Sequence, residues 1–243
     1  MTGRLATLTG DFLAQSPLRH GPFRVFYAGA IAAALGYTMQ TTVAAWLMAT
    51  LTPSEVMVAL VQTASTAPAL LFGLFAGAMA DIVDRRKVIV ATQVVLVAAS
   101  ALLGVAAIAG WVGPAMLLAM TFVVGAGFAF YQPAQQASVN DLVARAEMPQ
   151  AVSLNAVGFN VSRAIGPAIA GALTALVGTA SALFASAACF AAMIVAMRRV
   201  KTRAPILPGV PERLFSGVQI GLRYARHSPA LRAFILRTFS FTA

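Results

Sequence analysis

The chain has 243 residues, of which 60% are hydrophobic and only 10% are charged. An ordinary soluble domain carries about 25% charged residues, so this chain has too few polar groups to cover a surface that faces water. The formal net charge of +10 does not indicate nucleic-acid binding, because the basic residues lie between long apolar runs and are not interleaved with stacking aromatics. Cys189 is the single cysteine, which excludes an intrachain disulfide and a cysteine-cluster metal site. Composition therefore predicts an integral membrane protein.

Six long apolar runs predict six membrane-spanning helices. A helix needs about 20 apolar residues to cross roughly 30 Å of hydrocarbon, and a helix satisfies every backbone polar group within its own segment. The expected spans are residues 25–49, 56–80, 88–109, 114–133, 151–177 and 179–197. A seventh apolar run begins near Pro229 and is cut at Ala243, so we expect an incomplete seventh helix. The predicted fold class is an all-α transmembrane bundle.

The distribution of Lys and Arg predicts the orientation of these helices. The turns after the first, third and fifth spans contain no Lys or Arg, whereas the turns on the opposite side and both flanking segments are basic. We therefore expect a multi-pass protein of the plasma or inner membrane with a cytoplasmic N-terminus and no cleavable signal peptide. The expected organisation is a cytoplasmic segment at 1–22, a six-helix bundle at 23–197, a basic cytoplasmic connector at 198–228 and a truncated seventh helix at 229–243.

The short turn between the second and third spans gathers charges of both signs. Asp81 and Asp84 precede Arg85, Arg86 and Lys87. A stop-transfer cluster needs only the cations, and this simpler interpretation stays open. The carboxylates favour an ionic latch made of Asp81, Asp84, Arg85 and Arg86. In such a latch a carboxylate reaches a helix N-terminus or a cation on a neighbouring helix in one conformation and not in another.

The fifth span separates small residues and polar residues onto two faces of one helix. Gly158, Ser162 and Gly166 recur every four residues and lie on one face. Small side chains there allow another helix to approach closely. Asn160 and Arg163 lie on a second, polar face. We expect the first face to pack and the second to line a pathway.

Arg163 lies near the middle of the fifth span, where an arginine costs about 2.5–3.5 kcal/mol. We therefore expect it to face a water-filled cavity or a partner. No acidic residue lies at the membrane midplane of this chain, so the possible partners are Asn160, backbone carbonyls, a substrate anion or a second bundle. The alternative is a structural arginine that braces helix ends, if the span begins later than expected.

Side-chain amides within the spans are further candidates for a substrate pathway. Tyr131, Gln132, Gln135 and Gln136 end the fourth span, and any of them can line a pathway. Each amide is equally well explained as a hydrogen bond between helices. The predicted pathway residues are Gln40, Gln132, Asn155, Asn160 and Arg163.

Two motifs resemble signatures of the major facilitator superfamily. Gly77, Asp81, Arg85 and Arg86 resemble its loop between the second and third helices, although Ile82 stands where many members carry a basic residue. The fifth span contains Gly166-Pro167-x-x-x-Gly171, which resembles the fifth-helix signature of antiporters in this superfamily. The physical content of that motif is a helix that bends at Pro167 and packs closely at its glycines, Gly158, Gly166 and Gly171.

With Asn155, Asn160 and Arg163, the fifth span is similar to the exporter family that includes the enterobactin exporter. The resemblance implies the N-terminal half of a twelve-helix protein, built from two inverted three-helix repeats, with the substrate at the midplane between halves. It implies proton-driven export of a small drug-like or siderophore-like compound without a cofactor. The fourth span carries Thr121 near the position where many members place an arginine, so the usual proton-coupling residues do not carry over directly.

Two other classes of function stay open. The chain can be a non-transporting membrane module or an inactive truncated fragment, since only one complete bundle is expected and alternating access needs the missing C-terminal half or another bundle. A membrane enzyme is a distant third class, because the sequence contains no phosphate loop, zinc pair or nucleophile elbow. The predicted partners are a small-molecule substrate, a proton as coupling ion and the lipid bilayer.

Overall fold

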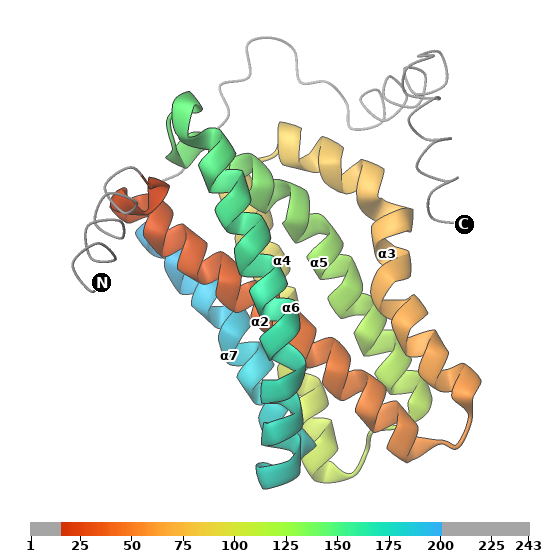
Figure 1. Cartoon of the computed structure of the whole chain (residues 1–243). Coiled ribbons are helices and arrows are strands. Elements are labelled where there is room, and N and C mark those ends of the chain that lie inside the picture. The colour runs from red at the N-terminus through yellow and green to blue at the C-terminus, as the bar shows by residue number, and fades with distance from the viewer. Residues whose placement is uncertain (1–15, 201–243) are drawn as a thin grey trace, which may run out of the picture.

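A computed structural model describes residues 16–200 of the chain, and within this range the protein is entirely helical (Figure 1). The helices are η1 (Pro17–Arg19), α2 (Gly21–Leu51), α3 (Glu55–Ile82), α4 (Arg85–Ala109), α5 (Pro114–Leu142), η2 (Arg145–Glu147), α6 (Met148–Val177) and α7 (Thr179–Arg199). The prediction of an all-α bundle is confirmed. Most of the expected connector and the start of a seventh helix lie outside the described residues.

Five of the described helices are long and apolar enough to cross a membrane, namely α3, α4, α5, α6 together with η2, and α7. Helix α2 is not among them, because Tyr37, Thr38, Gln40 and Thr41 interrupt its apolar sequence. The structure places α2 in contact with α3, α5, α6 and α7. Helix α2 therefore has protein on several sides and needs a less apolar surface than a helix that faces lipid.

Most helices extend beyond the apolar runs that predict them. The expected fourth span ends at residue 133, whereas α5 continues through a polar stretch to Leu142. Backbone hydrogen bonds continue a helix whether or not its side chains are apolar, so hydropathy marks the lipid-facing length and not the helix end. Two helices end at glycines with positive φ, Gly110 at 72° and Gly178 at 105°. Glycine adopts this conformation without the strain that a Cβ would cause.

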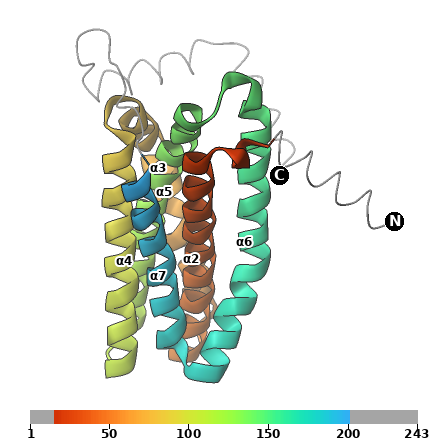
Figure 2. The ribbon, with the colours of Figure 1, turned by 90° about the vertical axis from the view of Figure 1, so that its left-hand side faces the viewer.

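Most of the extensive helix contacts join helices that are not consecutive in the chain. The most extensive contacts join α3 to α5, α2 to α7, α4 to α7, α2 to α6 and α4 to α5. Figure 2 shows α6 beside α2, and α7 between α2 and α4. One apolar core surrounds Phe26, Leu96 and Phe190, and a second surrounds Met48, Leu103 and Leu183. All Asp, Glu, Lys and Arg residues of 16–200 except Glu55 and Arg163 belong to helix ends and turns at one end of the bundle, which we name the charged end.

The contact between α6 and α2 depends on small residues. A Cβ at Gly158 would lie 2.9 Å from both Ile31 and the Tyr27 hydroxyl, and a Cβ at Gly166 would overlap the Thr38 side chain. Between these glycines, the Thr38 hydroxyl donates to the carbonyl oxygen of Ser162 at 3.1 Å. The two helix backbones are therefore too close for larger side chains at either position. In contrast, a Cβ at Gly171 would meet nothing within 4 Å among the described residues.

Replacing the glycines of α6 by alanine tests this contact. Both Gly166→Ala and Gly171→Ala gain helix propensity, about 1 kcal/mol each, but only Gly166→Ala forces a methyl group into Thr38, at a cost of about 1–3 kcal/mol. We expect Gly166→Ala to lower the melting temperature of the purified chain relative to Gly171→Ala. Thermal unfolding in detergent, followed by intrinsic fluorescence, measures the difference. Equal melting temperatures for the two variants would show that the close approach is not required.

Candidate functional site

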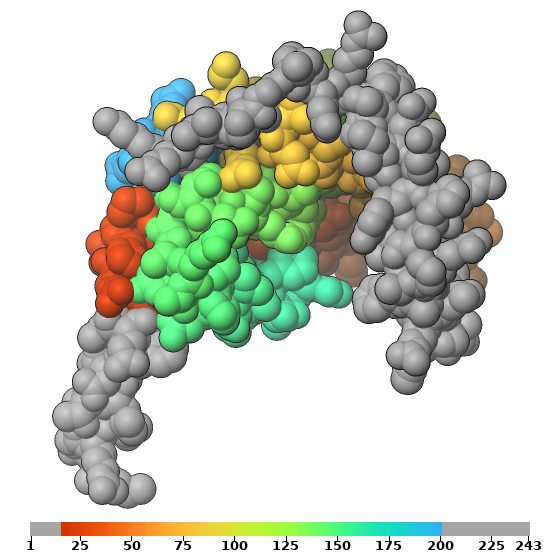
Figure 3. Space-filling view, turned by 90° about the horizontal axis from the view of Figure 1, so that it is seen from above, coloured from red at the N-terminus to blue at the C-terminus, as the bar shows by residue number. Residues whose placement is uncertain are grey.

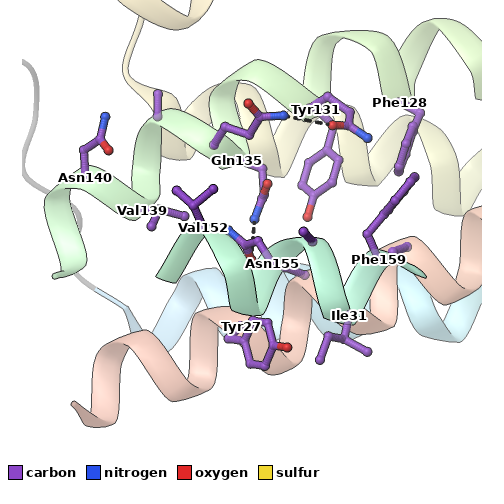
Figure 4. Close-up of a pocket in the computed structure, with 16 residues that line it drawn as sticks. Tyr27, Ile31, Phe128, Tyr131, Gln135, Val139, Asn140, Val152, Asn155 and Phe159 are labelled. Atoms are coloured by element: carbon purple, nitrogen blue, oxygen red, sulfur yellow. Dashed lines mark hydrogen bonds between the residues drawn. The ribbon is translucent and has the colours of Figure 1, made fainter. Parts of the chain in front are cut away.

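A cavity of about 510 Å³ lies between α2, α5 and α6, and we name it the α5–α6 cavity (Figure 4). Tyr27 and Ile31 line it from α2, Tyr131 and Gln135 from α5, and Asn155 from α6. The lining also includes Val139, Asn140 and Val152, which lie near the end of α5 and the start of α6. The cavity is therefore located in the half of the bundle nearer the charged end.

A second cavity, of about 400 Å³, lies beside the first, between α2, α3 and α5. We name it the α3–α5 cavity. Both cavities are lined by Phe128, Gln132 and Gln136. These three residues recur every four positions and therefore lie on one face of α5. This face of α5, flanked by α3 and α6, therefore borders both cavities.

Aromatic rings form the wall that the two cavities share. The Tyr37 ring of α2 stacks on the Phe128 ring of α5, with centroids 3.9 Å apart and planes 8° apart. The Phe128 ring in turn contacts the Tyr131 ring, at 5.6 Å between centroids. The Tyr37 hydroxyl donates to the Ser65 carbonyl of α3 at 3.2 Å. The rings are therefore held between three helices and present apolar surface to both cavities.

Amide side chains provide the polar groups of the α5–α6 cavity. The Gln135 amide donates to the Asn155 side-chain oxygen at 3.4 Å, which joins α5 to α6 across the cavity. The Gln136 amide donates to the Gln132 side-chain oxygen at 3.3 Å along α5. Both distances are longer than the usual 2.9–3.0 Å of such bonds. Because each amide carries two donor hydrogens and an acceptor oxygen, both pairs keep further donors and acceptors for a bound molecule.

The predicted pathway residues occupy three different environments. Gln132 and Asn155 line the cavities. Gln40 is buried in α2, lines neither cavity, and its side-chain amide has no hydrogen-bond partner among the described residues. Asn160 is exposed on α6, where its amide donates to the Ala156 carbonyl at 2.8 Å. Arg163 is also exposed and lies outside both cavities, with its guanidinium carbon 5.9 Å from the centre of the Phe159 ring.

The loop between α3 and α4 forms an ion pair with the end of α5. An Arg85 nitrogen lies 2.8 Å from an Asp141 carboxylate oxygen and also donates to the Ala137 carbonyl at 3.2 Å. Asp84 caps α4 by accepting from the Arg86 backbone N–H at 2.9 Å. Asp81 is exposed, and the described residues give it no ion pair. Of the four predicted latch residues, Arg85 therefore makes the contact between helices.

Sequence reasoning missed the acidic partners at the charged end, Asp141 and Glu147. Glu147, in η2, is buried and accepts from Arg19 of η1, and its second oxygen lies 2.9 Å from His20 Nε2. Figure 3 looks onto the charged end, where the start of α2 lies beside the end of α5 and η2. The signal in the sequence was that both acids lie within the expected connector between the fourth and fifth spans, residues 134–150. Nothing in that signal specified which cations they contact.

Residues 13–243 match the family of transmembrane secretion effectors in the major facilitator superfamily. The chain belongs to this family. It is 25% identical over 223 residues to the multidrug efflux pump Tap of Mycolicibacterium fortuitum, covering 88% of this chain and 54% of that protein. The Tap pump of Mycobacterium tuberculosis is 26% identical over 92% of this chain and 55% of its own length.

A third relative, the staphyloferrin A transporter of Staphylococcus aureus, is 29% identical over 60% of this chain and 37% of its own length. The chain spans about half the length of the Tap pumps that it matches. The prediction that the chain belongs to the major facilitator superfamily is confirmed, and the relatives named above include efflux pumps.

The ion pair at the charged end is tested by two matched amide substitutions. Asp141→Asn removes the negative charge that faces the half-buried Arg85, and we expect it to destabilise the purified chain by about 1 kcal/mol. Asp81→Asn removes an exposed charge without an ion pair in the described structure, so we expect no measurable change. Thermal unfolding in low salt compares the two variants with the parental chain. A larger effect of Asp81→Asn would contradict the assignment of Asp141 as the partner of Arg85.

Proposed function

We propose that this chain is the N-terminal half of a proton-driven exporter for small drug-like or siderophore-like compounds. The observation that carries this proposal is the hollowed face of α5, where stacked aromatic rings and amide groups line two cavities in a chain of the secretion-effector family. Ligand sites are typically apolar hollows with a few placed polar groups. The Tap relatives are named as multidrug efflux pumps, which supports export of drug-like compounds. The third relative is named as a transporter of the siderophore staphyloferrin A, which supports including siderophore-like compounds among the substrates.

The proposed architecture consists of two inverted three-helix repeats, α2–α4 and α5–α7. The packing supports this division, because exchanging the repeats maps the observed contacts onto one another. Exchanging α2 with α5, α3 with α6, and α4 with α7 converts the α3–α5 contact into the α6–α2 contact. The same exchange converts the α2–α7 contact into the α5–α4 contact. Transporters built from such repeats bind substrate at the interface between bundles.

We propose that the charged end lies in the cytoplasm. Among residues 16–200, every Lys and Arg except Arg163 lies at that end, as the positive-inside rule requires for a cytoplasmic side. The α5–α6 cavity is nearer this end, so a substrate would enter it from the cytoplasm. A second six-helix bundle would close the open side of the α5 face, and rocking of the two bundles would then expose the substrate to the outside.

Arg85 and Asp141 have a mechanical role in this proposal. Their ion pair joins the α3–α4 turn to the end of α5, which carries the cavity residues. Breaking the pair would release this end of α5, so the pair acts as a latch on one of the two conformations. Exposed Asp81, as well as Asn160 and Arg163 on α6, would face the second bundle. The charge of Arg163, near mid-membrane, then has water or a substrate anion beside it instead of lipid.

The main alternative is a membrane module that does not transport. The two cavities favour a transporter, because the amide groups on the hollowed face keep donors and acceptors beyond the hydrogen bonds that they make with one another. The assay below also distinguishes the alternatives, because a non-transporting module gives no export that depends on this face.

Gln132→Ala tests whether the α5 face contacts the substrate. Gln132 lines both cavities, so we expect cells that express the complete reading frame to export a fluorescent drug about three- to tenfold more slowly, which corresponds to one lost hydrogen bond. Gln62→Ala is the matched control, since Gln62 is an exposed amide of α3 that lines neither cavity. Drug accumulation, normalised to the amount of protein in the membrane, measures both.

In the same assay, Arg163→Ala should slow export and Arg163→Lys should restore it only partly, because an ammonium does not reproduce the guanidinium geometry. Normal export by Gln132→Ala and by both Arg163 variants would argue against the proposed pathway.

A further inference from the structure

Neither cavity has a charged side chain in its lining. The residues that line the two cavities include no Asp, Glu, Lys, Arg or His. An ion transferred from water into such a site loses several kcal/mol of hydration unless an opposite charge or several strong hydrogen bonds replace it. This half of the site therefore offers a permanent cation no opposite charge, only the faces of aromatic rings and amide oxygens. Arg163, one turn beyond Phe159 on α6, adds a positive charge nearby.

The Tyr131 hydroxyl is a polar group that needs a partner at the wall of the α5–α6 cavity. Tyr131 is 3% exposed, and its hydroxyl has no hydrogen-bond partner among the described residues. Figure 4 shows the Tyr131 side chain extending from α5 toward α6, into the space between Gln135 and Phe159. A buried hydroxyl without a partner costs about 1–3 kcal/mol. An acceptor atom of a bound molecule would recover this energy.

The shape and surface of the lining favour a flat molecule. Phe128, Tyr131 and Phe159 present ring surface to the α5–α6 cavity, and Phe128 and Tyr37 present it to the α3–α5 cavity. Aromatic rings stack on one another with offset or edge-on contacts worth about 0.5–1.5 kcal/mol beyond the apolar area that they bury. The amides of Gln132, Gln135 and Asn155 supply neutral donors and acceptors at the edge of such a ring.

We propose that this half of the transporter selects uncharged, flat aromatic compounds, with an acceptor atom bound to the Tyr131 hydroxyl, and discriminates against permanent cations of the same shape. The proposal rests on the proposed function, since it assigns a substrate class to the same cavities. It also makes Tyr131 a specificity-determining residue, because the hydroxyl groups of the other tyrosines at the cavities already have hydrogen-bond partners. The other tyrosine hydroxyls at the cavities already donate to backbone carbonyls, that of Tyr27 to Leu154 and that of Tyr37 to Ser65.

Acridine and N-methylacridinium test the proposal, because they share one ring system and differ in permanent charge at mildly alkaline pH. The full 243-residue chain in lipid nanodiscs is heated with increasing concentrations of each compound, and the rise in melting temperature reports binding. We expect acridine to raise the melting temperature. The same rise should require a concentration of N-methylacridinium at least about tenfold higher. Empty nanodiscs and Gln62→Ala control for partition into lipid and for non-specific binding.

Two tyrosine variants separate binding from folding. Tyr131→Phe removes a hydroxyl that has no partner, so we expect the ligand-free melting temperature to stay the same or rise, and the acridine affinity to fall about five- to tenfold. Tyr27→Phe removes a hydroxyl that donates to Leu154 at 2.8 Å, and we expect it to lower the ligand-free melting temperature. A structural role of Tyr131 would instead lower the melting temperature and leave the acridine affinity unchanged.

The inference fails if N-methylacridinium stabilises the chain as well as acridine does, if neither compound stabilises it, or if Tyr131→Phe binds acridine normally. The proposed function has a separate test, since export by the complete reading frame is measured with other compounds. Export of a cationic drug that depends on Gln132, together with failure of acridine to bind, would keep the exporter and reject this substrate class. Absence of any export that depends on the α5 face would reject the proposed function itself.

Discussion

The bundle depends on two helix contacts that only glycine permits. Gly166 of α6 lies against Thr38 of α2, and a Cβ at Gly125 of α5 would lie 2.5 Å from the Ser65 carbonyl oxygen of α3. Side chains larger than hydrogen at these positions would push α6 away from α2 and α3 away from α5. Since α3 and α6 form the outer walls of the two cavities, these contacts set the width of the cavities. Packing and the candidate function are therefore determined by the same small residues.

At the charged end, ion pairs and not glycine contacts hold the helices together. Arg85 and Asp141 hold the α3–α4 turn to α5, and Arg19 and His20 hold the start of α2 to Glu147 in front of α6. The connector between α5 and α6 thus has an ion-pair cluster at each of its ends. Asn140 and Val152 line the cavity on either side of this connector. Movement of either cluster would consequently change access to the cavity.

The sequence predicted the helices well because hydropathy acts over about 20 consecutive residues. It underestimated α5, whose last nine residues are too polar for an apolar run but continue the helix. It also predicted an apolar first span, whereas the burial of α2 among four helices allows it a polar middle. Gly158, Ser162 and Gly166 lie on one face of any helix, so their common orientation followed from spacing alone, whereas only the structure identifies α2 as the helix that they contact.

The partners across the bundle were beyond sequence reasoning. Arg85 and Asp141 are separated by 56 residues, and Arg19 and Glu147 by 128. A single sequence contains no information that pairs one cation with one of five acids in residues 16–200. Similarly, Gln40 and Gln132 are both amides within apolar runs, and only the packing shows that Gln132 lines the cavities whereas Gln40 does not.

The central claim is that the α5 face borders a water-filled cavity within the membrane, and cysteine accessibility tests it most directly. Gln132→Cys and Val105→Cys are introduced separately into the chain carrying Cys189→Ser. Val105 is an exposed apolar residue of α4 that lines neither cavity and provides the lipid-facing comparison. We predict that a charged, water-soluble thiol reagent modifies position 132 in native membranes and leaves position 105 unmodified. Modification of position 105 with protection of position 132 would contradict the account, because the α5 face would then be covered and the aqueous surface would lie elsewhere.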